Sequence, residues 1–294
     1  MENLKSKKIL VTGASGFVGQ NLVHNLESLG ATVCGLDETV DLRDFEQIKG
    51  AFLEFNPEVV FHLGALVDLS RDFKVAQNCV DINIKGALNV LEACVQAKVS
   101  KIVFMSTQEV YGNSKTPYKE NQPLLPPSPY AISKVAGESF CKYYKTVCNL
   151  DYSIVRMSTA YGSFQQNTRL IPTIINKALR GENIDLNSGQ KERDYIFVED
   201  AVSGLVKIAL SKKALGLEFN LGGGKSYKLE YLARKIVELC KSKSTINLGV
   251  FPDRVGEADM MLSSIARAKE ILGWQPENSL ENGLLKTINW FKNG

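Results

Sequence analysis

Short apolar runs alternate with amphipathic stretches through the first half of the chain. The runs are rich in β-branched residues and end at turn residues, so they predict strands at 8–12, 31–36, 58–62, 101–106 and 152–157. Between the runs, apolar residues recur at helical spacing and predict a helix that ends near Gly30 and further helices at 45–55, 81–98 and 130–148. Buried strands that alternate with helices are typical of a parallel sheet covered on both faces, so we expect a doubly wound α/β fold of the Rossmann type.

The second half of the chain is less regular. Polar loops there separate helices that we predict at 172–180, 198–211 and 229–241. We therefore expect residues 1–160 to form a first domain and residues 161–294 to form mainly a smaller C-terminal α/β lobe, with some segments returning to the first domain. Such a lobe would lie over the carboxyl ends of the strands, where open α/β sheets bind their ligands.

Composition narrows the possible function classes. The 294 residues include 35 Lys and Arg against 32 Asp and Glu, a net charge of +3, which gives no strong attraction to nucleic acid or to a membrane surface. No segment approaches the roughly 18 apolar residues of a membrane span and no secretory signal is evident, so we expect a soluble, cytoplasmic protein. With two histidines, and six cysteines in no C-x-x-C pair, we expect no metal site and mostly buried, reduced thiols.

A glycine-rich turn follows the first predicted strand. Gly13, Gly16 and Gly19 open a helix, so the backbone N–H groups at its positive end are placed to bind a pyrophosphate. Asp37 ends the second predicted strand 18 residues after Gly19, where a carboxylate accepts hydrogen bonds from ribose hydroxyls and repels a 2′-phosphate. This context favours a dinucleotide-binding domain for NAD, with NADP as the weaker alternative, over a plain glycine turn beside an exposed aspartate.

Other residues near the same strand ends join the expected cofactor site. They are Phe17, Val18, Asp41, Leu42, Leu63, Gly64 and Ala65. The Asp–Leu pair would lie beside the adenine, and the small residues after the third strand would let the cofactor approach the backbone. His62, just before them, is interpreted as a packed core histidine rather than a ligand.

A tyrosine and a lysine share one face of the helix predicted at 130–148, because Tyr130 and Lys134 are spaced i and i+4. A lysine near a tyrosine favours phenolate, so we expect Lys134 to lower the pKa of Tyr130 and allow proton exchange at neutral pH. The interconversion of an alcohol and a ketone needs this proton transfer together with hydride transfer to nicotinamide. Thr107 ends a strand 23 residues earlier and would hydrogen-bond the same reacting oxygen, unless it only caps the strand end.

These motifs together resemble the extended short-chain dehydrogenase/reductase family, which includes the NAD-dependent epimerases and dehydratases of nucleotide sugars. The similarity extends nearly end to end, through VTGASGFVG (11–19), DLRD (41–44), HLGA (62–65), MSTQEVYG (105–112), SPYAISKVAGE (128–138), RDYIFVED (193–200) and AKEILGW (268–274). The resemblance implies Thr107, Tyr130 and Lys134 as the catalytic set and a nucleotide sugar as the substrate. It also implies that Ser158 lies against the nicotinamide, and that helices 81–98 and 130–148 pair in a homodimer.

The resemblance further implies which residues contact the substrate. They are Val67, Thr107, Tyr130, Thr159, Arg193, Arg254 and Met261. The two arginines would bind the nucleotide diphosphate, since their forked donors fit phosphate oxygens, and Met261 would gate the sugar pocket. The chain departs from the family at Thr159, where asparagine is usual, and at Ser163, where proline is usual.

Several reactions share this scaffold. The NAD-type Asp37 and the short spacing from Thr107 to Tyr130 favour a 4-epimerase, which works through a transient 4-keto intermediate with Tyr130 as acid and base. The short loop after Asp37 resembles the nucleotide-4-keto-6-deoxy-sugar reductases, which are the alternative. Glu109 matches one carboxylate of the 4,6-dehydratases and decarboxylases, so it is either a further catalytic residue or a structural loop carboxylate. An alternative of another class is a dinucleotide-sensing module without turnover.

Overall fold

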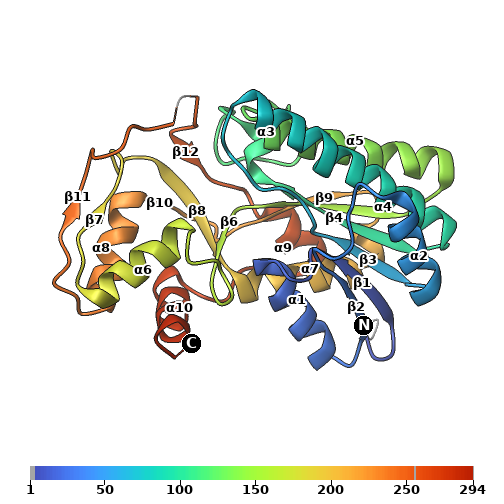
Figure 1. The fold of residues 1–294 in the computed structure, drawn as a ribbon, viewed down its shortest axis with the longest axis horizontal. Helices are drawn as coiled ribbons and strands as arrows, with labels where there is room; N and C mark the ends of the chain where they lie inside the picture. Colours follow the sequence, from blue (N-terminus) through green and yellow to red (C-terminus); the bar gives the residue numbers. More distant parts are fainter. Residues whose placement is uncertain (1–3, 255, 294) are drawn as a thin grey trace.

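The computed structural model describes residues 4–254 and 256–293, which form two lobes joined by several chain crossings (Figure 1). The larger lobe contains a six-stranded parallel sheet with the order β2-β1-β3-β4-β5-β9. Its strands are β1 (Lys8–Thr12), β2 (Thr32–Leu36), β3 (Val59–His62), β4 (Lys101–Thr107), β5 (Tyr152–Met157) and β9 (Glu218–Leu221). The doubly wound fold expected from the sequence is therefore confirmed.

Helices cover both faces of this sheet. They are α1 (Phe17–Ser28), α2 (Phe45–Phe55), α4 (Lys85–Gln96), α5 (Pro129–Cys148), α7 (Val198–Leu210) and α9 (Ala266–Leu272). Because side chains alternate along a strand, Ile9 and Val11 of β1 pack on the α1 and α7 side, whereas Leu10 packs with α2 and α4. Figure 1 shows α2, α4 and α5 on one face and α1 and α7 on the other.

The two helices with the clearest start signals begin at side-chain caps. Asp44 accepts hydrogen bonds from the backbone N–H groups of Glu46 and Gln47 at the start of α2. Ser128 accepts one from Ala131, and Pro129 occupies the first helical position of α5, where its missing N–H is not needed. The proline-rich loop therefore delivers the chain directly into the helix that carries Tyr130.

The prediction of one helix at 81–98 is wrong at its beginning. The segment starts with α3 (Phe73–Asn78), continues as a π-helix (Cys79–Ile84) and becomes regular only in α4. The wider π turn breaks the 3.6-residue period, so the apolar pattern did not reveal these first two turns. The π-helix turns Asn83 inward, where its Oδ1 accepts a hydrogen bond from Leu66 N at 2.7 Å and its Nδ2 donates to Ser133 Oγ at 2.9 Å.

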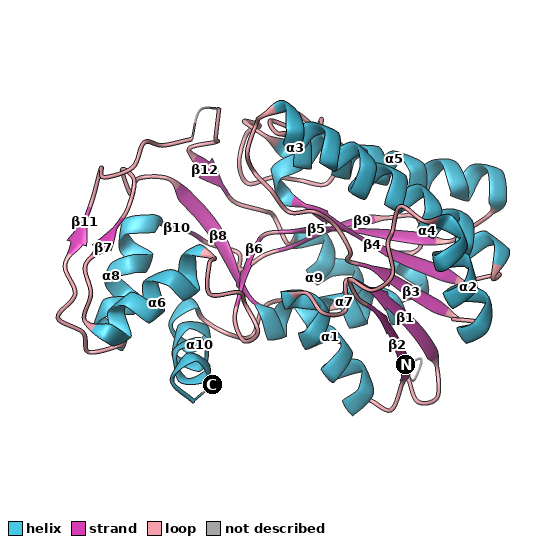
Figure 2. Ribbon diagram, in the orientation of Figure 1, coloured by secondary structure: helices cyan, strands magenta, loops and turns pink. Residues whose placement is uncertain are grey.

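The smaller lobe contains short strands that the sequence pattern did not predict (Figure 2). They are β6 (Thr159–Tyr161), β7 (Ile184–Asp185), β8 (Glu192–Phe197), β10 (Ser226–Lys228), β11 (Ile246–Asn247) and β12 (Met260–Met261). Strand β8 is central, since β10, β12 and β6 all pair with it, and β7 pairs with β11. The helices of this lobe are α6 (Leu170–Arg180), α8 (Leu229–Leu239) and α10 (Leu280–Asn293).

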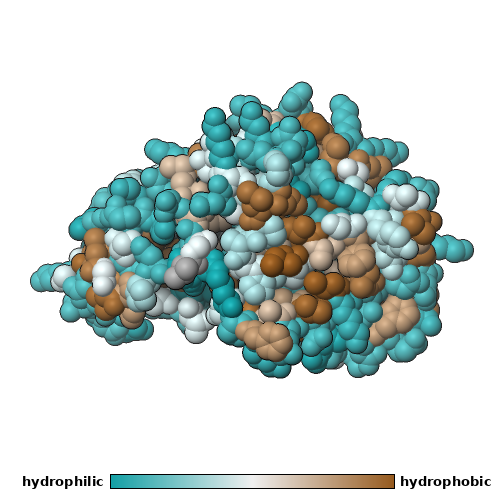
Figure 3. Space-filling model, turned by 90° about the horizontal axis from the view of Figure 1, so that it is seen from above, coloured by the Kyte–Doolittle hydropathy of each residue, from teal (hydrophilic) through white to brown (hydrophobic). Residues whose placement is uncertain are grey.

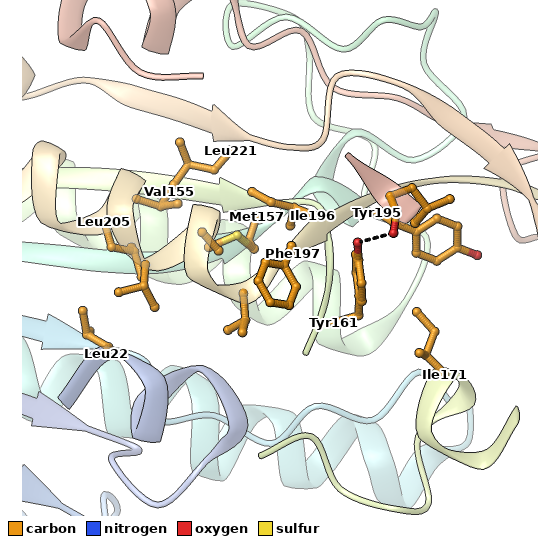
Figure 4. Packing of buried hydrophobic residues seen from close by; sticks show 14 of the residues in the cluster. Leu22, Val155, Met157, Tyr161, Ile171, Tyr195, Ile196, Phe197, Leu205 and Leu221 are labelled. Carbon is orange, nitrogen blue, oxygen red and sulfur yellow. Dashed lines mark hydrogen bonds between the residues drawn. The ribbon is translucent and has the colours of Figure 1, made fainter. Parts of the chain in front are cut away.

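One continuous core joins the lobes (Figure 4). Val155 and Met157 of β5, with Leu205 of α7, pack in the same cluster as Tyr161 and Phe197 of the smaller lobe. The dashed line in Figure 4 is the hydrogen bond that the hydroxyl of Tyr161 donates to the carbonyl of Leu280, at 3.2 Å. This core fixes the smaller lobe over the carboxyl ends of the large sheet.

Candidate active site

A cleft of about 1060 Å³ lies between the lobes at the carboxyl ends of the strands. Every candidate site residue from the sequence lines it. These are Gly13, Gly16, Phe17, Val18, Gly19, Asp37, Asp41, Leu42, Leu63, Gly64, Ala65, Val67, Thr107, Glu109, Tyr130, Lys134, Ser158, Thr159, Arg193, Arg254 and Met261. The structure thus brings together residues from both lobes that are far apart in the sequence.

The glycine turn is packed too closely for side chains. A Cβ at Gly13 would lie 2.8 Å from the Cα of Gly64, and Gly13 has a φ of +70°. A Cβ at Gly19 would lie 2.0 Å from the carbonyl oxygen of Gly13. Helix α1 begins here without a side-chain cap, so its first N–H groups face the cleft as an anion-binding end. This bare cradle fits the pyrophosphate of a dinucleotide.

Two carboxylates lie at the far end of the same groove, after β2. Asp37 accepts hydrogen bonds from Thr39 N at 2.9 Å and Thr39 Oγ1 at 2.7 Å, which lowers its pKa. Asp41 binds the guanidinium of Arg43, and these hydrogen bonds lower the pKa of Asp41 to about 2. Both groups are therefore charged at neutral pH, and Asp37 has the position and charge that suit ribose hydroxyls.

Tyr130 and Lys134 of α5 meet Thr107 of β4 near the middle of the cleft. Tyr130 and Lys134 are both buried. The Lys134 Nζ donates to the carbonyl of Met105 at 2.9 Å and lies 5.9 Å from the centroid of the Tyr130 ring. The Thr107 side chain lies near the phenol of Tyr130, and its Oγ1 accepts from Glu109 N at 3.2 Å. Thr107 therefore caps the strand end and also lies beside the phenol.

The prediction that Lys134 lowers the pKa of Tyr130 is wrong for this structure. Burial raises the pKa of Tyr130, because a phenolate loses solvation in the protein interior, and the nearby Glu109 adds to this effect. Burial also lowers the pKa of Lys134 to about 8. The ammonium donates to the Met105 carbonyl and lies over the ring face, and the burial of the phenol decides the direction in which its pKa shifts.

Glu109 lies in the first turn of a short 3₁₀ helix (Gln108–Tyr111), near Tyr130. Burial raises its pKa, although Ser128, Arg71 and Arg254 counteract part of the effect. A carboxyl group with a raised pKa can donate as well as accept a proton. Glu109 is thus chemically suited to acid–base catalysis.

The side of the cleft that is expected to take the substrate includes Arg193 and Arg254 in its lining. Arg193 of β8 forms an ion pair with Glu257, with an N–O distance of 2.6 Å, whereas Arg254 is exposed at the rim. Met261 of β12 is buried beside Tyr118 and Ala258. Thr159 follows Ser158 and accepts a 3.4 Å hydrogen bond from Gln108 Nε2.

Two buried polar residues near the cleft, His62 and Ser158, hydrogen-bond other side chains of the protein. His62 is 2 % exposed, its Nδ1 lies 2.7 Å from Thr12 Oγ1, and burial lowers its pKa to about 3, so its interpretation as a packed core histidine is confirmed. Ser158 donates to Asp194 at 3.0 Å. Asp194 was not among the residues expected at the site. The one sequence signal for it is its position next to Arg193 in the RDY motif.

Membrane spans, metal sites and the state of the cysteines were also considered in the sequence predictions. Within residues 4–254 and 256–293, no helix is long and apolar enough to cross a membrane. The same residues contain no cluster of three or more His, Cys, Asp or Glu side chains that could hold a metal ion. All six cysteines are free, and Cys79, Cys94 and Cys141 are buried as expected, but Cys148 is exposed at the end of α5.

Comparison with known proteins identifies the family. The sequence profile of the NAD dependent epimerase/dehydratase family matches residues 9–222. The chain is 32% identical to a UDP-glucose 4-epimerase of Mycolicibacterium smegmatis, over 97% of this chain and 99% of that protein. It is 31% identical to a dTDP-glucose 4,6-dehydratase of Haemophilus influenzae, over 96% of this chain and 97% of that protein.

Solved structures agree with this assignment. A UDP-glucose 4-epimerase of Thermotoga maritima with UDP-glucose superposes with a TM-score of 0.91 at 28% identity, covering 97% of this chain and 99% of that one. A UDP-glucose 4-epimerase of Thermus thermophilus in complex with NAD gives a TM-score of 0.90 at 27% identity, covering 98% and 99%. The chain belongs to the NAD dependent epimerase/dehydratase family and is an NAD-dependent enzyme of nucleotide sugars.

Proposed function

We propose that the chain is a nucleotide-sugar 4-epimerase that works through a transient 4-keto sugar. The observation that carries the proposal is the meeting of Tyr130, Thr107 and Lys134 in the cleft that also contains the glycine cradle. An alcohol at C4 that enters the middle of this cleft would lie beside a proton acceptor and the expected nicotinamide at once. The similarity to UDP-glucose and UDP-glucuronate 4-epimerases supports the same reaction.

The residues divide the work as follows. The turn at Gly13, Gly16 and Gly19 holds the pyrophosphate of NAD, Asp37 binds its adenosine ribose, and Ser158 lies on the nicotinamide side. NAD held there would supply the hydride acceptor and donor that the interconversion of a C4 alcohol and a 4-keto group needs. Tyr130 removes the proton of the 4-hydroxyl and later gives it back, while Thr107 orients the same oxygen.

Lys134 keeps a proton close to the phenol. Its pKa of about 8 leaves the amine mostly protonated at neutral pH but able to exchange. Since burial raises the pKa of Tyr130, the phenol is protonated at rest, and it must pass that proton to the neutral form of Lys134 before it can accept the proton of the 4-hydroxyl.

On the substrate side, Arg193 and Arg254 bind the diphosphate. Arg193 is paired with Glu257 at 2.6 Å, so the diphosphate must share or displace this carboxylate. Val67, Thr159 and Met261 surround the sugar. The wide choice of nucleotide bases and sugars among similar proteins makes a substrate panel the first experiment.

A 4,6-dehydratase or decarboxylase is the second candidate, and Glu109 is the observation that favours it. Its raised pKa and its place beside Tyr130 suit the proton transfer of an elimination. Similarity to a dTDP-glucose 4,6-dehydratase points the same way. A 4-keto reductase is a third candidate, less well supported because Asp37 disfavours the 2′-phosphate of NADPH.

The test is incubation of the purified protein with UDP-, GDP-, CDP- and dTDP-sugars, with and without added NAD(P)H. Interconversion of C4 epimers without net cofactor consumption is the expected result. Stoichiometric NAD(P)H oxidation with a 4-keto sugar would instead identify a reductase, and loss of water or carbon dioxide would identify a dehydratase or decarboxylase. Tyr130→Phe serves as the control, since it removes only the phenol hydroxyl and should abolish whichever conversion is seen.

We also propose that the protein forms a homodimer through α3, the π-helix and α5. The side chains of Val80, Ile132, Tyr143 and Val147 are exposed there. An apolar hollow of about 130 Å³ lies between the π-helix and the start of α5. Figure 3 views the molecule from the side of these helices and shows hydrophobic side chains gathered over them. A second copy of the same face would cover these side chains by two-fold symmetry.

A further inference from the structure

A buried carboxylate connects the two walls of the cleft. Asp194 of β8 is fully buried and accepts hydrogen bonds from three parts of the chain. Its Oδ2 accepts from Ser158 Oγ at 3.0 Å and from Ser263 N at 3.3 Å, and its Oδ1 accepts from Gly223 N at 2.7 Å. A carboxylate buried in this way is held in place by its donors and in turn fixes their positions.

The loop after β9 is shaped to admit this carboxylate. A Cβ at Gly222 would lie 2.2 Å from Asp194 Oδ2, and a Cβ at Gly223 would lie 2.1 Å from the carbonyl oxygen of Tyr195. These approaches are impossible for any other residue type, so both glycines are explained by the contact with β8. The close packing of this loop against β8 therefore depends on glycine at positions 222 and 223.

The hydrogen bonds continue to the catalytic strand. Ser158 Oγ also lies 3.2 Å from Ser263 Oγ, and Ser263 Oγ donates to Gln108 Oε1 at 3.2 Å. Gln108 directly follows Thr107 in the sequence. The network thus runs from the strand end beside the expected nicotinamide to the strand end that carries the catalytic threonine.

Ser263 belongs to the wall that faces the expected sugar. Met261, two residues before it, lines the cleft and pairs with Arg193 in the β8–β12 ladder. On its other side this segment is held by Tyr118, whose N–H donates to the Leu262 carbonyl at 2.7 Å. The hydrogen bonds that Asp194 accepts from Ser158 and from Ser263 therefore fix the position of this wall relative to Ser158.

We propose that Asp194 is a positioning residue, which holds the substrate wall at Met260–Ser264 in register with the cofactor side of the cleft at Ser158. This inference rests on the proposed function, because it assigns the wall to the sugar. Asp194 does not touch substrate or cofactor. Its charged Oδ2 accepts hydrogen bonds both from Ser158 on the cofactor side and from Ser263 on the substrate wall, and so holds the two together.

A second buried aspartate, six residues later in the chain, provides a matched control. Asp200 of α7 is also buried, and its carboxylate accepts hydrogen bonds from Glu277 N at 3.0 Å and Asn278 N at 3.1 Å. It too joins segments far apart in the sequence, but it does not line the cleft. Asp194→Asn and Asp200→Asn therefore remove the same charge from similar surroundings, and only the first lies between the two walls.

The experiment measures kcat and KM of both variants and hydrogen exchange of the peptide that contains residues 260–264. In Asp194→Asn the amide nitrogen replaces one carboxylate oxygen and cannot accept a hydrogen bond, so at least one of the N–H donors, Ser263 N or Gly223 N, loses its acceptor. KM for the nucleotide sugar should therefore rise about tenfold, the effect of one hydrogen bond to a charged group. Exchange should increase at 260–264. Asp200→Asn should keep the wild-type KM and show increased exchange at 274–278 instead.

The pH profile adds a readout that a purely structural role would not change. Burial raises the pKa of Asp194 to about 6, so its charge is present above that pH and is lost below it. The groups around it are neutral there: the two serine hydroxyls, the glycine N–H groups and the phenol of Tyr227 on β10. KM of the wild type should rise as the pH falls through about 6, and Asp194→Asn should lack this dependence.

Equal KM values for the wild type and Asp194→Asn, or equal increases in both variants, would overturn the proposal. If the wild type converts no sugar in the panel, the proposed 4-epimerase function fails by itself. The positioning role is then decided by calorimetric binding of UDP-glucose and by the exchange at 260–264, with the same contrast expected between the two variants.

Discussion

The buried ion pair beside β4 tests how strongly the free energy of unfolding depends on a buried charge that keeps its partner. Glu138 of α5 and Arg156 of β5 are 1 % and 2 % exposed, and their closest N–O distance is 2.6 Å. Glu138 Oε1 also accepts from Ser106 Oγ at 2.6 Å, directly before Thr107. Glu138→Gln keeps the volume of the side chain and removes its charge, so Arg156 remains buried without its counter-charge.

The size of the effect follows from these contacts. Removing one partner of a buried pair costs about 3–5 kcal/mol. Arg156 keeps two acceptors, the hydroxyl of Tyr111 at 2.9 Å and the carbonyl of Glu120 at 3.0 Å, so we expect a value at the low end of this range. A loss of about 3 kcal/mol corresponds to a fall in Tm of roughly 5 °C for a chain of this size.

Thermal unfolding followed by circular dichroism is the assay, and Glu182→Gln is the control. Glu182 binds Arg180 with the same 2.6 Å distance, but both side chains are exposed, so its Tm should not change measurably. A double variant, Glu138→Gln with Arg156→Gln, should lose less stability than the sum of the two single variants. Equal Tm values for Glu138→Gln and Glu182→Gln would refute the argument from burial.

Three further predictions concern the cleft and the outer face. Gly19→Ala places a methyl group against the carbonyl oxygen of Gly13, so it should abolish NAD binding measured by calorimetry, and unchanged affinity would contradict the cradle. Glu109→Gln should keep kcat/KM for 4-epimerisation within about threefold, whereas a loss of about 100-fold or more would identify Glu109 as an acid–base group and favour a dehydratase or decarboxylase. Ile132→Glu should convert the expected dimer to a monomer in sedimentation velocity, and a wild type that is monomeric at micromolar concentration would disprove the interface.

The sequence was sufficient to predict five of the six strands of the large sheet and the residues that line the cleft, but not β9. Strands such as β1 and β3 carry continuous apolar runs because both of their faces are covered, and parallel strands present their carboxyl ends at one edge. Once the strands were known, the residues after each of them, such as Gly13 and Thr107, had to meet. The site was therefore predictable from the places where the strands end.

Contacts between distant segments were not predictable in the same way. Strand β12 has two residues, and its pairing with β8 depends on tertiary contacts rather than on a pattern. The role of Asp194 depends on Ser263, 69 residues later in the chain. The pKa of Tyr130 was predicted with the wrong sign because i, i+4 spacing gives the proximity of Lys134 but not the burial of the phenol.

The return of β9 to the edge of the large sheet has a practical consequence. Because β9 pairs with β5, and α7 packs on α1, a fragment cut after residue 160 would leave β5 as an open edge and strip an apolar face from α1. An unprotected edge of this kind invites intermolecular strand pairing. The nucleotide half of the molecule should therefore aggregate when expressed alone, and studies of cofactor binding require the intact chain.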